Sequence, residues 1–92
     1  MATIVVTLRI MPKDPTISLD EIRDQATKEV TLFGGNVGKC VYEPVAFGLK
    51  AVKLFFLMPE ELGGTEKLEN AIATNVFGVE SVHTEDVRRT IG

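Results

Sequence analysis

The apolar residues of this chain recur with a period of two in some stretches and of three to four in others, and the order of these stretches restricts the fold. The first stretch has aliphatic side chains at alternate positions: Ile4, Val6, Leu8 and Ile10. Such alternation, rich in β-branched residues, is typical of a strand with one buried face. Pro12 and Pro15 follow and are expected to end this strand and to leave a short connection.

The next stretch has the pattern of a helix with a marked start and end. Ser18 and Glu21 form a Ser-x-x-Glu capping box, in which each side chain is expected to accept a hydrogen bond from the backbone N–H of the other residue. Gly34-Gly35 is expected to end the helix, since glycine adopts the left-handed cap conformation at little cost. The apolar residues between these signals recur at helical spacing: Leu19, Ile22, Ala26, Val30 and Phe33.

Two further strands are predicted next, over residues 37–42 and residues 45–58, and the second has enough β-branched and aromatic residues to be central. Pro44 lies between them and is expected at the turn or at a strand end. After the loop at Gly63-Gly64, Thr65 is the expected N-cap of a second helix. The apolar stripe of that helix is Leu68, Ala71 and Ile72. Residues 79–87 are predicted to form the last strand, with Val82 in the core.

The predicted order is therefore strand, helix, strand, strand, helix, strand. Right-handed crossovers place both helices on one face of a four-stranded antiparallel sheet. This is a ferredoxin-like βαββαβ sandwich of the α+β class, formed by residues 1–92 as a single domain. The turn between the second and third strands then lies at one end of the sheet and the fourth strand ends at the other. A strand of about ten residues spans roughly 33 Å, so Phe47 is expected to lie far from Arg88 and Arg89.

Composition argues against several classes of function. The net charge is -3, with ten basic and thirteen acidic residues, whereas duplex nucleic-acid binders normally carry a basic surface. Cys40 is the only cysteine, which fits a reducing cytosol and excludes a thiolate metal site within the chain. The start of the sequence lacks the pattern of a signal peptide, and no apolar run is long enough to span a membrane. A soluble, cytoplasmic protein is expected.

Side chains typical of catalysis are sparse. His83 is the only histidine, and it has no cysteine at metal-ligand spacing. Glu60-Glu61 and Glu85-Asp86 are interpreted as solvated charges rather than as acid–base pairs. Adjacent strand residues point to opposite faces, so Glu85 and Asp86 are not expected to converge on one substrate. The sequence therefore predicts neither an enzyme nor a metal site.

The segment Glu43-Pro44-Val45-Ala46-Phe47-Gly48-Leu49-Lys50 places a proline, an aromatic residue and a glycine in quick succession. A sharp turn there would leave the aromatic side chain near a sheet end, where a partner protein could bind it. Together with Glu85-Asp86-Val87-Arg88-Arg89, this segment resembles archaeal elongation factor 1-beta. Members of that family share a ferredoxin-like fold, which agrees with the order of elements derived above.

The resemblance implies a guanine-nucleotide exchange factor of translation whose partner is the GTPase elongation factor 1-alpha. Such a factor binds the nucleotide-free conformation of the GTPase and so promotes exchange of GDP for GTP, with no covalent chemistry and no cofactor. In the family, an aromatic residue of the Phe-Gly segment docks on one part of the GTPase, and the C-terminal end reaches toward the nucleotide and Mg²⁺. The implied partner-binding residues are Phe47, Gly48, Lys50, Asp86, Arg88 and Arg89.

The sequence departs from the family pattern at one position. Eukaryotic relatives carry a C-terminal lysine that enters the Mg²⁺ site, whereas this sequence has no lysine after Lys67. Arg88 or Arg89 could displace the metal instead, although guanidinium is bulkier and planar where ammonium is compact. The sequence therefore does not assign the displacement of Mg²⁺ to a particular residue.

Two other classes of function are compatible with the predicted fold. A small-molecule regulatory module would need a pocket or a dimer interface lined with polar groups. A single-stranded RNA binder would need paired aromatic residues on the exposed face of the central strands. Phe55 and Phe56 are adjacent and are expected to face opposite sides, which disfavours RNA binding.

Overall fold

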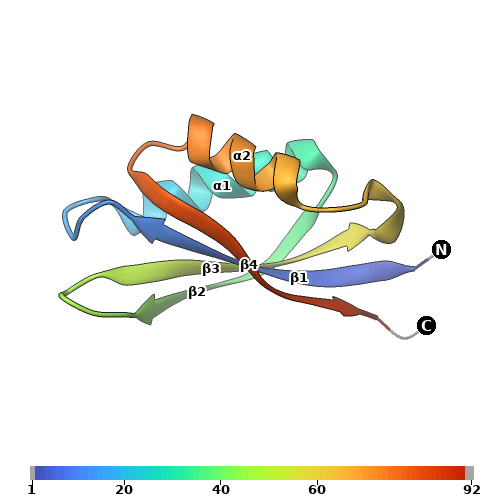
Figure 1. Ribbon diagram of the computed structural model, residues 1–92, viewed down its shortest axis with the longest axis horizontal. Coiled ribbons are helices and arrows are strands. Elements are labelled where there is room, and N and C mark those ends of the chain that lie inside the picture. Colours follow the sequence, from blue (N-terminus) through green and yellow to red (C-terminus); the bar gives the residue numbers. More distant parts are fainter. Residues whose placement is uncertain (1, 91–92) are drawn as a thin grey trace.

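Strand β1 (Thr3–Pro12) lies inside the sheet and pairs with strands from later parts of the chain. The structure, a computed structural model, describes residues 2–90. Its four strands form one antiparallel sheet in the order β2-β3-β1-β4, and both helices cover one face of it (Figure 1). The ferredoxin-like α+β fold is confirmed. The other elements are α1 (Leu19–Phe33), β2 (Asn36–Pro44), β3 (Lys50–Pro59), η1 (Glu60–Leu62), α2 (Glu66–Asn75) and β4 (Val79–Arg89).

The core lies between the sheet and the two helices. The predicted face of β1 is confirmed, since Val6, Leu8 and Ile10 are fully buried and Ile4 packs against them at the edge of the core. Strand β3 and the helices supply most of the remaining core side chains, which are Val52, Leu54, Phe56, Met58, Ile22, Ala26, Val30, Leu68 and Ile72. Val82, the predicted core residue of β4, is half-buried and packs against the core, while Val79 of the same edge strand is buried.

Helix α1 begins and ends where its sequence predicts. Ser18 Oγ accepts a hydrogen bond from the Glu21 N–H at 3.2 Å, and Gly34 caps the other end with a left-handed φ of 112°. Only this half of the predicted capping box is formed among the described residues, because no hydrogen bond links the Glu21 carboxylate to the Ser18 N–H. One hydroxyl bond and the glycine cap are therefore the local signals that limit this helix.

The end of β2 and the start of β3 lie at other residues than predicted. Strand β3 begins at Lys50 rather than at residue 45, and β2 extends to Pro44. The Val45 N–H donates to the Leu49 carbonyl and the Leu49 N–H donates to the Ala46 carbonyl, both at 2.9 Å. These bonds close a tight turn, so residues 45–49 connect the strands instead of belonging to one.

Polar contacts attach the two edge strands to the helices. Tyr42 on β2 donates a hydrogen bond to Asp20 of α1, and burial together with this bond raises the pKa of Tyr42 to about 12. On the other edge, Thr84 of β4 donates to Glu69 of α2 at 2.7 Å, and Thr65 donates to the same carboxylate. Thr65 starts α2 as predicted, but its side chain makes no capping hydrogen bond. Within residues 2–90, no helix has the length and hydropathy needed to cross a membrane.

Candidate functional site at the two ends of the sheet

The strand register puts the two segments singled out in the sequence at opposite ends of the sheet. Lys50 pairs with Pro44 where the β2–β3 turn begins. This pair lies closer to the end of the sheet than the pair that Val52 forms with Ile10 of β1. At the other end of β1, Ile4 pairs with Arg89. The longest dimension of the Cα trace is 42 Å. The predicted separation of Phe47 from the arginine pair is confirmed, and only a large partner could contact both.

Phe47 occupies the outermost position of the β2–β3 turn, which we call the tip (residues 45–49). Its side chain is 96% exposed. Phe47 has a φ of 54° and Gly48 a φ of 77°, so both central residues of the turn have positive φ, as in the type I′ turns that suit β-hairpins. Glycine and asparagine are the usual residues there, whereas a phenylalanine with positive φ is rare.

The conformation of Phe47 is unfavourable for folding, and no burial offsets it. A left-handed conformation costs a residue with a Cβ about 1–2 kcal/mol. Phe47 is the only non-glycine residue with positive φ among residues 2–90, and it is also the most exposed of the large apolar residues described there. Strained residues of this kind concentrate at functional sites. The tip therefore displays an aromatic side chain that the fold itself does not need.

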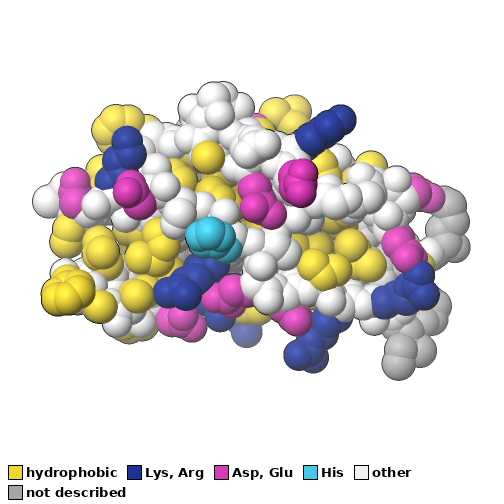
Figure 2. All heavy atoms as spheres, in the orientation of Figure 1, with side chains coloured by type: hydrophobic (Ala, Val, Ile, Leu, Met, Phe, Trp, Pro, Cys, Tyr) yellow, Lys and Arg dark blue, Asp and Glu magenta, His cyan; other side chains and the backbone are white. Residues whose placement is uncertain are grey.

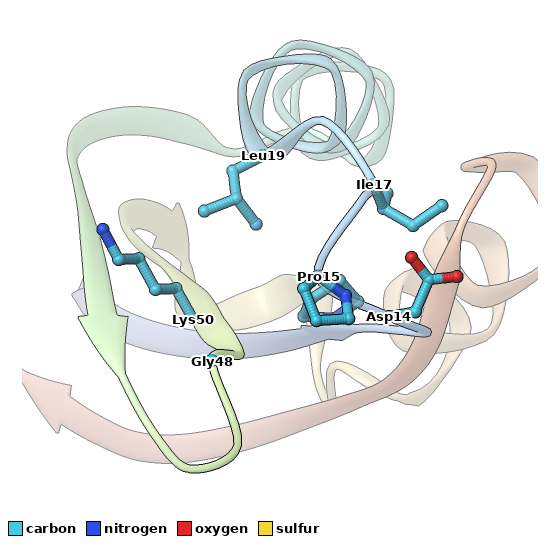
Figure 3. A pocket seen from close by; sticks show the side chains of 7 residues that line it. Asp14, Pro15, Ile17, Leu19, Gly48 and Lys50 are labelled. Carbon is cyan, nitrogen blue, oxygen red and sulfur yellow. The ribbon is translucent and has the colours of Figure 1, made fainter.

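Gly48 and Lys50 lie beside a groove between the tip and the β1–α1 connection. The groove has a volume of about 240 Å³ and is lined by Pro12, Asp14, Pro15, Ile17, Leu19, Gly48 and Lys50. Figure 3 shows Leu19 pointing into the space between α1 and the start of β3, with Asp14 and Lys50 on opposite sides. No atom outside its chain neighbours lies within 4 Å of the point where a Gly48 Cβ would be, so another backbone can approach there.

At the other end, Arg88 and Arg89 project from opposite faces of β4. Arg88 lies opposite Val5 and Arg89 opposite Ile4, which are neighbours on β1. Arg88 Nε donates to Asp86 Oδ2 at 2.8 Å, so Arg88 and Asp86 form an ion pair. Arg89 pairs with Glu60 of η1. Both guanidinium groups remain largely exposed, and Ile91 and Gly92 lie outside the described residues.

The prediction that Glu85 and Asp86 face opposite sides of the sheet is wrong, because a β-bulge interrupts the register. Thr7 pairs with Asp86 and Leu8 pairs with Thr84, so Glu85 is an extra residue in β4. Glu85 therefore joins Asp86 on the open face, the sheet face opposite the helices. Glu85 contacts Lys53 at 3.0 Å and Arg9 at 3.9 Å. The hydrogen bond between Glu85 and Lys53 is the main reason that the pKa of Lys53 is raised.

The open face carries aromatic, basic and acidic side chains in contact with one another. Phe55 lies on this face between Lys39 and Lys53, while Phe56 is buried on the other side, so the predicted divergence of the two aromatics is confirmed. His83 is exposed opposite Arg9, and Cys40 is half-buried. Among residues 2–90, no three side chains of the metal-binding types His, Cys, Asp and Glu lie together in a geometry suited to a metal ion.

One exposed aromatic residue, Phe77, was not predicted from the sequence. Phe77, in the connection between α2 and β4, has a side chain that is 82% exposed. The signal was present in the sequence, because Phe77-Gly78 repeats the Phe47-Gly48 pair, and both glycines have positive φ. The Arg89–Glu60 ion pair was also missed, because no local pattern connects residues 29 positions apart.

Comparisons with known proteins agree with these features. The family described as the EF-1 guanine nucleotide exchange domain matches residues 5–90. Elongation factor 1-beta of Staphylothermus marinus is 43% identical, over 97% of this chain and 98% of the relative. The protein of the same name from Desulfurococcus amylolyticus is 42% identical over the same shares. Among solved structures, the ACT domain from GTP pyrophosphokinase of Chlorobium tepidum has a TM-score of 0.56 at 18% identity, over 87% of this chain and 95% of that chain. At that identity the likeness concerns the fold alone.

The strain at the tip yields a stability prediction. Phe47→Asn places an asparagine, which tolerates positive φ, before Gly48 and so creates the preferred Asn-Gly turn. We expect the free energy of unfolding to rise by about 0.5–1 kcal/mol, measured by urea denaturation with an unchanged m-value. Phe47→Ala, which keeps a Cβ at positive φ, is the control and should leave stability nearly unchanged. A stability of the Phe47→Asn variant at or below that of the natural protein would contradict the assignment of backbone strain to Phe47.

Proposed function

The chain belongs to the family of EF-1 guanine nucleotide exchange domains, and from that premise we propose that it holds elongation factor 1-alpha in its nucleotide-free conformation through contacts at both ends of the sheet. Its function as a nucleotide exchange factor of translation elongation follows from the family. The observation that carries the two-ended mechanism is the exposed, strained Phe47 at the tip, opposite an exposed arginine pair about one strand length away.

The tip supplies the anchor. Phe47 presents a nearly complete aromatic surface to solvent, on a turn whose backbone is fixed by two hydrogen bonds. A fixed backbone reduces the conformational entropy that the turn loses when this side chain enters an apolar pocket of a partner. Gly48 lets the partner's backbone come close, and Lys50 places a cation at the rim of the neighbouring groove. These three residues form the first contact with elongation factor 1-alpha.

The end of the sheet that carries Arg88 and Arg89, which we call the arginine end, acts on the nucleotide. A cation brought close to a Mg²⁺ site competes with the metal for its anionic ligands and so weakens metal and nucleotide together. Arg88 and Arg89 are held only by exposed ion pairs, and such pairs contribute little free energy. Phosphates or carboxylates of the GTPase can therefore replace Asp86 and Glu60 as partners at small cost. Because the two arginines lie on opposite faces, only one of them reaches a given site.

Exchange by this mechanism depends on the thermodynamic linkage between binding of the nucleotide and binding of the factor, and no covalent bond is broken. A factor that lowers nucleotide affinity must itself be released by nucleotide to the same degree. A coupling of ~4 kcal/mol corresponds to roughly a thousandfold weaker nucleotide binding. The protein needs no cofactor for this, binds neither nucleic acid nor membrane directly, and acts in the cytoplasm, where its GTPase partner works.

The direct test is release of labelled GDP from the cognate elongation factor 1-alpha, with and without this protein. We expect the release rate to rise with the concentration of the factor and to reach a plateau. Excess unlabelled GTP should dissociate the complex, as the reciprocal coupling requires. No acceleration at saturating protein would refute the proposal and leave the small-molecule module as the alternative.

The anchor role of Phe47 predicts a loss of affinity without a loss of fold. Phe47→Ala should weaken binding to the GTPase by ~2–4 kcal/mol, as truncation of an interface anchor does. Isothermal titration measures this change, and circular dichroism verifies the fold. Leu32→Ala is a suitable control, because Leu32 is 82% exposed on α1 and away from the tip. Equal affinity of the Phe47→Ala variant and the natural protein would remove the tip from the interface.

The role of the arginine end predicts a separation of exchange from binding. Arg88→Ala and Arg89→Ala are made singly, because deletion of residues 88–92 would also remove the pairing of Arg88 and Arg89 with β1. One of the two variants should lower the maximal GDP release rate by roughly tenfold or more while affinity changes less. Lys28→Ala, which removes an exposed cation from α1, controls for net charge. Equal losses of rate and affinity in both arginine variants would contradict a role near Mg²⁺.

A further inference from the structure

Phe77 is the second aromatic side chain that the fold leaves in solvent. It is 82% exposed, although the residues on both sides of the Phe77-Gly78 pair, Val76 and Val79, are buried. The β1–α1, β2–β3 and α2–β4 connections lie at the same end of the molecule (Figure 1). Phe77 therefore belongs to the end that carries Phe47. Figure 2 shows hydrophobic side chains gathered at this end.

The backbone around Phe77 is held in place from both sides. The Val76 N–H donates to the Ile72 carbonyl at 3.0 Å, which caps α2. The Gly78 carbonyl accepts a bond from the Lys13 N–H at 2.8 Å. Gly78 has a φ of 83°, and a Cβ at this position would lie 2.5 Å from Ile17 Cγ2, so the turn packs directly on the β1–α1 connection. Phe77 is thus displayed by a rigid backbone.

The turn that carries Phe77 and the groove beside the tip share one residue, Ile17. Ile17, which packs on Gly78, also lines the groove beside the tip, together with Gly48. The groove has apolar walls from Pro12, Pro15, Ile17 and Leu19, and Asp14 and Lys50 add charged groups to it. Phe77 itself lines a second groove, together with Glu21, Gln25, Asn75 and Val76. The two exposed aromatics therefore lie on either side of the segment that carries Ile17.

We propose that Phe77 is a second anchor for the same GTPase, which contacts both Phe47 and Phe77 at this end of the molecule. This inference rests on the proposed function. A single anchor leaves the bound factor free to rotate about Phe47. A rotation of about 10° moves a group roughly 33 Å away by about 6 Å, which is enough to carry an arginine out of the nucleotide site. The second anchor removes this freedom and aligns Arg88 and Arg89.

The proposal is tested by titrating the GDP release assay with Phe77→Ala. We expect the concentration for half-maximal release to rise by roughly tenfold, and the maximal rate to fall because the arginine end is no longer aligned. Phe77→Leu, which retains part of the apolar contact, should lie between Phe77→Ala and the natural protein. Leu32→Ala, with the same exposed fraction as Phe77, should behave as the natural protein does.

The outcomes separate the two proposals. If the natural protein does not accelerate release at all, the proposed function fails. If Phe47→Ala weakens binding but Phe77→Ala matches the natural protein in both half-maximal concentration and maximal rate, this inference alone is overturned. Urea denaturation of each variant identifies any loss of fold. A destabilised Phe77→Ala with a normal Phe77→Leu would also overturn it, because Phe77 would then act by packing.

Discussion

The antiparallel pairing of β1 with both β3 and β4 is the constraint on which the rest of this structure depends. Because β1 lies between these strands, β3 begins at one end of the sheet and β4 finishes at the other. The β2–β3 turn and the arginine pair are thereby held about one strand length apart by a rigid ladder. In the proposed function, this separation lets a protein of 92 residues contact two distant parts of its GTPase partner.

Both aromatics at the tip end are displayed at a cost to the folded chain. Phe47 adopts a conformation that glycine or asparagine would adopt more easily, and Phe77 leaves a large apolar surface in water. Neither cost is recovered within the chain, whereas a partner that buries these side chains would recover it. A rigid display of this kind favours binding because little conformational freedom is left to lose.

The arginine end differs from the tip, because its guanidinium groups already have partners in the folded chain. Arg88 and Arg89 are matched with local carboxylates while they remain exposed, so their charge is partly compensated until a stronger anionic partner approaches. Surface ion pairs of this type are worth little, and exchange of one partner for another is correspondingly cheap. In the proposed function, the tip therefore provides an apolar anchor and the arginine pair competes electrostatically with Mg²⁺.

The sequence by itself determined the order of elements, the buried faces of β1 and α1, and the helix limits at Ser18 and Gly34. These features depend on periodicity and capping, which act between residues close in the chain. The tertiary structure alone decided that a bulge brings Glu85 beside Asp86, that Arg89 pairs with Glu60, and that the Phe77 turn packs against Ile17 and so adjoins the tip. Such contacts depend on strand register and on packing between distant segments, and no local pattern encodes them.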